Sequence, residues 1–152
     1  AIAPRVPSVV PEGGISAIDI QQGMLGDCYF LAPLSALADK HSGLAERLLV
    51  TTPEAAQLGV SICRLSIEGR WRSVPVAHCF PCHSWGALAF SGAARGSIWV
   101  PLLEKAWAKV HGSYQAAESG LPSEAFRALT GAPVQHYQLA GVQHSRADSQ
   151  NL

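Results

Sequence analysis

The sequence predicts a mixed α+β domain in which helices pack beside a small antiparallel sheet. Residues 28–39 and 97–111 have the apolar spacing of buried or half-buried helices. Between them, residues 59–78 alternate apolar and polar side chains on either side of Glu68-Gly69, which is typical of a β-hairpin. Long helices and a local hairpin in one short chain indicate the α+β class.

The two long helices carry recognisable start and stop signals. Residues 28–39, "CYFLAPLSALAD", are apolar on nearly every side, so this helix should be buried at the centre of the domain. Asp27 stands where a carboxylate can cap the free N–H groups of the first turn, and Pro33 predicts a local kink. Ser97 is the expected cap of the second long helix, and Gly112 its expected end.

Shorter elements complete the predicted fold. We expect a second helix over 44–50, a third strand over 87–90 and a last helix within 121–131 that Ser123 caps. The apolar pattern of the first hairpin strand changes phase near Cys63, which predicts a β-bulge.

Composition and charge exclude several classes of protein. Apolar residues make up 48% of the 152 residues and charged residues only 14%, so most of the chain should fold around a real core. Eleven basic residues balance eleven acidic ones, which gives no electrostatic reason to expect nucleic acid or an anionic membrane as a partner. No apolar run is long enough to span a bilayer. Four cysteines in a chain of this length do not make a disulfide framework, so we expect a reducing, cytoplasmic location.

The sharpest chemical signal is "QQGMLGDCYFL", residues 21–31. It places Cys28 at the start of the apolar helix, where unpaired N–H groups stabilise a thiolate. The Cys28 backbone N–H points into the same space, and a Gln22 amide would be a second donor that completes an oxyanion hole. Gly23 and Gly26 should let the intervening loop turn tightly. This arrangement of a cysteine and two hydrogen-bond donors resembles the active site of papain-type thiol proteases.

Two sequence blocks carry a family resemblance. The stretch "QGMLGDCYFLA", residues 22–32, resembles the calpain signature Gln-Gly-x-Leu-Gly-Asp-Cys followed by an aromatic residue and an apolar helix. The stretch 99–139, which begins "WVPLLEKAWAKVHGSY", resembles the calpain block Trp-x-x-Leu-Leu-Glu-Lys-Ala-Tyr-Ala-Lys and Gly-Ser-Tyr. The resemblance covers residues 12–139, between an irregular segment 1–11 and a polar tail 140–152.

The resemblance implies the first, cysteine-bearing half of a papain-like calpain core, and a calcium-dependent cysteine endopeptidase that acts on intracellular proteins. Cys28 would be the nucleophile and Gln22 the oxyanion donor. By the same resemblance, calcium would bind Asp19, Glu104 and the carbonyl of Gly14, which are hard oxygen ligands. No organic cofactor is implied.

The resemblance also implies that the catalytic site is shared with a second half of the protease core. Calpains take the histidine and asparagine that activate the cysteine from that half. The only asparagine here is Asn151, outside the matching region, and none of the six histidines has the expected Gly-His context. We therefore expect this chain to be inactive by itself.

Two other interpretations stay open. The chain could be a non-catalytic binding or regulatory module that uses the calpain fold, with an exposed apolar face that a partner covers. A weaker interpretation concerns "HCFPCH", where His78, Cys79, Cys82 and His83 are zinc-ligating residue types and Cys-x-Pro-Cys resembles a redox site. Four zinc ligands from one tight turn are unusual. A redox site would need a helix after the motif, and the residues from Ser84 onward are unlike a helix start. A loop with two free thiols is therefore the default expectation.

Overall fold

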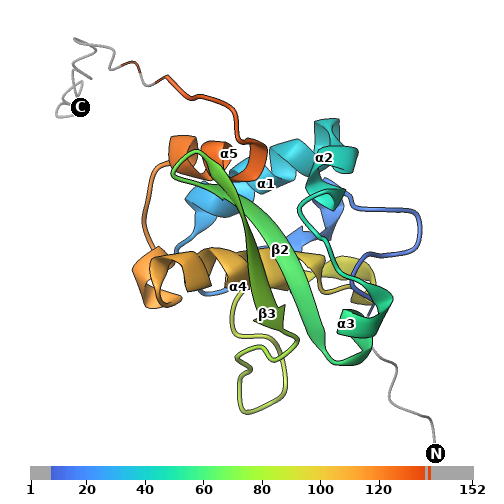
Figure 1. Cartoon of the computed structure of the whole chain (residues 1–152). Helices are drawn as coiled ribbons and strands as arrows, with labels where there is room; N and C mark the ends of the chain where they lie inside the picture. The colour runs from blue at the N-terminus through green and yellow to red at the C-terminus, as the bar shows by residue number, and fades with distance from the viewer. Residues whose placement is uncertain (1–7, 136, 138–152) are drawn as a thin grey trace, which may run out of the picture.

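The computed structural model describes residues 8–135 and residue 137, and it confirms the α+β class (Figure 1). The hairpin lies across α4, while α1 and α5 lie together above α4 in this view, with α5 beside the hairpin turn (Figure 1). The helices are α1 Cys28–Lys40, α2 Ser42–Glu46, α3 Pro53–Gln57, α4 Trp99–His111 and α5 Pro122–Thr130, and the strands are β1 Ile20–Gln21, β2 Val60–Ile67, β3 Arg70–Ala77 and β4 Gly92–Ala93.

The core is built where α1, α4 and the hairpin meet. Phe30 of α1 is fully buried and stacks on Trp107 of α4, with ring centroids 5.0 Å apart. The same indole donates its Nε1–H to the Tyr29 hydroxyl at 3.0 Å, and that hydroxyl donates to the carbonyl of Ala117. Helix α1 is therefore the central buried helix that its apolar sequence predicts, and it continues through Pro33 to Lys40.

The hairpin is confirmed, but the bulge near Cys63 is wrong. Strands β2 and β3 pair without interruption from Val60 opposite Ala77 to the turn. The turn residues Glu68 and Gly69 both have positive φ angles, 52° and 75°, as a tight two-residue hairpin turn requires. The apparent change of phase arises because polar Ser61 is buried on the strand, where its hydroxyl is hydrogen bonded to His78 Nε2 at 2.8 Å.

Two predicted elements are placed differently. Helix α2 ends at Glu46 rather than extending over 44–50, because the chain that follows it bonds to β2: the Arg64 N–H donates to the Leu48 carbonyl at 2.7 Å. Residues 87–90 form no strand, although Leu88 makes an isolated bridge. The strand in this region is β4, which pairs antiparallel with β1 just before the Gln22 loop.

Some of the predicted helix caps and ends are confirmed, and others are wrong. Gly112 and Gly131 end α4 and α5 in left-handed conformations, as predicted. The serine caps are wrong, because Ile98 and Leu121 occupy the cap positions of these helices and make no side-chain cap. Asp27 occupies the cap position of α1, yet its carboxylate accepts no hydrogen bond from the first turn.

The described residues differ from the predicted folded region, 12–139, at both ends. At the N-terminal side, Ser8 is part of the ordered fold, because its carbonyl accepts from the Ile98 N–H at 3.0 Å. The predicted tail 140–152 lies outside the described residues. Within the described part of the chain, no helix has the length and apolar character to cross a membrane.

Candidate active site

The predicted nucleophile lies at a helix N-terminus on the protein surface. Cys28 is the first residue of α1, and it is exposed although the next three residues are buried. The body of the helix is thus fixed in the core while its first thiol faces solvent. An exposed thiol held at a rigid helix N-terminus can reach a substrate carbonyl without any rearrangement of the backbone.

The loop before Cys28 is held by close backbone contacts. A Cβ atom at Gly23 would overlap the backbone carbonyl of Phe90, and one at Gly26 would lie 3.1 Å from the carbonyl oxygen of Glu118. Neither glycine has a positive φ angle, so close approach rather than a left-handed turn explains both. The Met24 N–H adds a hydrogen bond to the Ala89 carbonyl at 3.3 Å.

Gln22 is an exposed side chain on this fixed loop. Its amide Nε2 donates to the carbonyl of Leu25 at 3.4 Å, which is a long hydrogen bond. In the described residues neither Gln22 nor any histidine is hydrogen bonded to the Cys28 thiol. The structure therefore places both predicted catalytic residues on the surface, at the two ends of one rigid loop, and it leaves the thiol without an activating base from this part of the chain.

Asp27 forms a buried pair with Glu104 of α4. Asp27 is fully buried and Glu104 is 2% exposed, and the charge of Asp27 acts on Glu104. Two neighbouring carboxyl groups that are removed from water do not both ionise easily. Burial raises the pKa of Asp27 to about 6. Burial and the nearby charge of Asp27 raise the pKa of Glu104 to about 8, so Glu104 keeps its proton at neutral pH.

Asp27 stands at the cap position of α1 without capping the helix. Its two oxygens are buried and have no hydrogen-bond partner among the described residues. Glu104 also accepts from the backbone N–H of Ser91, at 3.1 and 3.2 Å to its two oxygens. This bond joins α4 to the segment that leads into β4.

The predicted calcium ligands do not share one set of contacts. The Asp19 carboxylate and the Gly14 carbonyl both bind the guanidinium of Arg95. Glu104 instead contacts Asp27 and Ser91. Two of the three predicted oxygen ligands therefore converge on a single positive group, and the third has other partners.

Asp19 is a fully buried carboxylate that stays ionised. Burial by itself opposes its charge, but hydrogen bonds from Arg95, the Ser16 N–H and the Trp99 indole outweigh that cost, so the pKa of Asp19 lies below its usual value. The contacts are short: 2.7 Å from Arg95 Nε to Oδ1, and 3.2 Å from Trp99 Nε1 to Oδ2. Arg95 is a site residue that the sequence analysis missed. Its segment, "AARG", has no recognisable motif, and only the folded chain brings it to Asp19.

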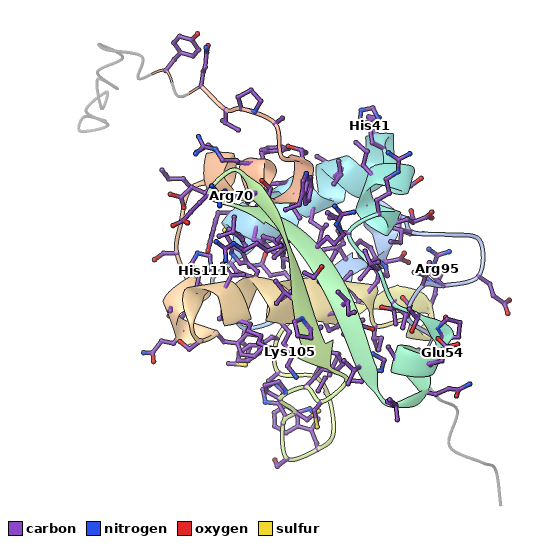
Figure 2. All side chains as sticks on the ribbon, in the orientation of Figure 1. His41, Glu54, Arg70, Arg95, Lys105 and His111 are labelled. Carbon is purple, nitrogen blue, oxygen red and sulfur yellow. The ribbon has the colours of Figure 1, made fainter. Side chains whose placement is uncertain are left out.

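The "HCFPCH" segment is a loop whose side chains have separate partners. His83 stacks on Trp85 with ring centroids 4.3 Å apart, and the exposed Cys82 thiol donates to the Phe80 carbonyl at 3.5 Å. Lys105 of α4, labelled in Figure 2, binds backbone carbonyls at the start of this loop. Across residues 8–135 and 137, no group of three or more His, Cys, Asp or Glu side chains could hold a metal ion, so the zinc interpretation gains no support.

Comparison with known proteins gives a consistent result. The sequence model of a family described as "calpain family cysteine protease" matches residues 3–152. The calpain-type cysteine protease DEK1 of Zea mays is 40% identical over 121 residues, which cover 79% of this chain and 6% of the maize protein. Calpain-10 of Macaca fascicularis is 36% identical over 153 residues, which cover 98% of this chain and 23% of that protein. The chain thus spans less than a quarter of the length of either relative.

Proposed function

Because the chain belongs to the calpain family of cysteine proteases, we propose that it contributes the nucleophile half of a cysteine endopeptidase site. The observation that carries this proposal is the exposed Cys28 thiol at the first position of a buried helix. Protein substrates follow from the peptidase family, and the cytoplasm is the proposed location because all four cysteines are free.

The proposed chemistry assigns one role to each group. The Cys28 thiolate attacks the carbonyl carbon of the scissile peptide bond and forms a thioester, while the amine leaves with a proton. The backbone N–H of Cys28 and the amide of Gln22 donate hydrogen bonds to the oxyanion that develops on the carbonyl. Water then attacks the thioester and releases the new carboxylate.

In this scheme, a base outside the described residues accepts the proton of the Cys28 thiol. We assign this role to a histidine of a second protease-core half, oriented by an asparagine. That histidine takes the proton of the Cys28 thiol and returns it to the leaving amine. The support is that the four histidines of the described residues (His41, His78, His83 and His111) make no hydrogen bond to the thiol.

Calcium is the proposed regulator. Its ligands here would be the Asp19 carboxylate and the Gly14 carbonyl, which already converge on the guanidinium of Arg95, with Glu104 added if it leaves Ser91 and Asp27. The converging hard oxygens fit a divalent cation. When bound, calcium would supply positive charge that links the N-terminal loop to the body of the domain.

A binding module is the second candidate, and exposed apolar side chains near the site favour it. Met24, inside the loop between Gln22 and Cys28, is 78% exposed, and Ile18 just before β1 is 74% exposed. A contiguous patch of such side chains, rather than single ones, is typical of a surface that another protein covers. The same surface would suit a second protease-core half or a different partner.

The decisive experiment measures peptide hydrolysis by the chain alone and after mixing with the second core half of a calpain relative. We expect little turnover alone, turnover in the mixture, complete loss in Cys28→Ala, and a loss of about 10²- to 10³-fold in kcat for Gln22→Ala. Substantial hydrolysis by the chain alone that Cys28→Ala abolishes would overturn the need for a second half. Binding of the second half without any turnover would favour the binding module.

A further inference from the structure

Arg95 is the side chain that holds the N-terminal loop to the domain. Its Nε and Nη2 donate to the two oxygens of Asp19, each at 2.7 Å, which is a bidentate ion pair. Nη2 also donates to the Gly14 carbonyl at 3.0 Å, and Nη1 to the Glu12 carbonyl at 3.4 Å. In Figure 2, Arg95 lies beside the N-terminal loop on one side of the molecule.

The arginine occupies an unfavourable backbone conformation to reach these oxygens. Its φ and ψ angles are 61° and 19°, in the left-handed region where a residue other than glycine is uncommon. Such a conformation persists when surrounding contacts compensate it. The four hydrogen bonds of the guanidinium are contacts of this kind, and Ser97 Oγ adds a hydrogen bond to the Ala94 carbonyl, so loss of the Arg95 bonds would weaken the hold on Ala94–Gly96.

A guanidinium and a calcium ion cannot bind these oxygens together. Calcium would need the Asp19 and Gly14 oxygens at about 2.3–2.6 Å. Arg95 Nη2 already lies 2.7 and 3.0 Å from Asp19 Oδ2 and Gly14 O, so its nitrogen stands where the ion would be. Two positive groups this close would also repel each other.

We propose that Arg95 is a built-in competitor of calcium, so that the chain exists in an arginine-held form and a calcium-held form that exclude each other. This inference rests on the calcium regulation proposed above. Because calcium binds only the chains in which Arg95 has released Asp19, its apparent affinity is lowered by the fraction of chains in that state. Release of Asp19 by Arg95 also frees the segment Ala94–Gly96, which directly follows β4. Strand β4 pairs with β1 through Gly92 and Gln21, and Gln21 is the neighbour of Gln22.

The test measures calcium affinity directly, by titration calorimetry on the wild-type chain and on Arg95→Gln, without any substrate. We expect Arg95→Gln to bind calcium at least tenfold more tightly than wild type, and Arg95→Lys to fall between them because lysine keeps the charge but loses the bidentate geometry. Arg64→Gln is the matched control, since it removes the same charge from an exposed arginine on β2 and should change the affinity less than twofold.

A second measurement locates the ion. Terbium, used in place of calcium, should show emission sensitised by Trp99, because the indole Nε1 lies 3.2 Å from Asp19 Oδ2. Asp19→Asn in the Arg95→Gln background should abolish both the emission and the heat of calcium binding. Arg95→Gln could be less stable than wild type. In that case, calcium should raise the unfolding temperature of Arg95→Gln more than it raises that of wild type. This shift tests the same competition on the folded molecules.

Two results would overturn the inference. One is an equal calcium affinity in wild type and Arg95→Gln, which would mean that the arginine does not compete. The other is tight binding that survives Asp19→Asn, which would place the ion elsewhere. Neither result touches the peptidase proposal, since hydrolysis in the mixture with the second core half is measured separately and depends on Cys28.

Discussion

The carboxyl groups of Asp27, the residue before Cys28, and Glu104, in the middle of α4, are buried and influence each other's ionisation. Burial raises the pKa of both groups, to about 6 and about 8. The folded chain therefore holds protons that the unfolded chain, with ordinary carboxyl pKa values, has already released.

The pair predicts that stability falls as pH rises from about 5 to 8. In this range the folded state binds more protons than the unfolded state, so raising the pH favours unfolding. Urea unfolding at pH 5, 6.5 and 8 measures this slope. Glu104→Gln should flatten it, because an amide does not titrate in this range. A slope that is the same in Glu104→Gln and wild type would mean that other groups cause it.

The free cysteines should differ sharply in reactivity. Cys28, Cys79 and Cys82 are exposed, whereas Cys63 is fully buried, donates its thiol to the Leu102 carbonyl, and has a pKa that burial raises to about 12. We expect iodoacetamide at pH 8 to label the exposed thiols of the native chain and to leave Cys63 unlabelled until urea unfolds it. Peptide mapping measures each site, and equal rates at Cys63 and Cys28 would contradict the described core.

Gly23→Ala should destabilise the fold, because its Cβ would overlap the Phe90 carbonyl. Forced shifts of this kind cost about 1–3 kcal/mol in the free energy of unfolding. Gly43→Ala in α2 is the matched control: nothing lies within 4 Å of its added Cβ, and it should be neutral or stabilising by up to about 1 kcal/mol. Urea denaturation compares the two, and equal effects would show that the loop is not held against Phe90.

Tyr29→Phe should also destabilise the chain, by about 1–3 kcal/mol. The substitution removes a hydroxyl that accepts from Trp107 Nε1 and donates to the Ala117 carbonyl, and it leaves both partners buried without a bond. The ring and its packing stay, so near-ultraviolet circular dichroism should keep its native form. An unchanged free energy of unfolding would mean that water satisfies these groups.

Much of the fold was predictable because its signals are local. The apolar sequence of α1, the Glu68-Gly69 turn and the glycines that end α4 and α5 each act within a few residues. The errors have local causes as well. The bulge at Cys63 was inferred from apolar side chains alone, while the strand also buries a polar serine that has its own hydrogen-bond partner.

The sequence by itself determined the family, the α+β class and the placement of Cys28 at a helix start, since each depends on residues that are neighbours along the chain. Only the tertiary structure decided what the buried charges do. Asp19 and Arg95 are separated by 76 positions, and Asp27 meets Glu104 across two helices. Removal from water makes an unpaired carboxylate costly. The groups that surround each buried carboxylate are therefore decided by the packing of distant segments. No local sequence pattern predicts them.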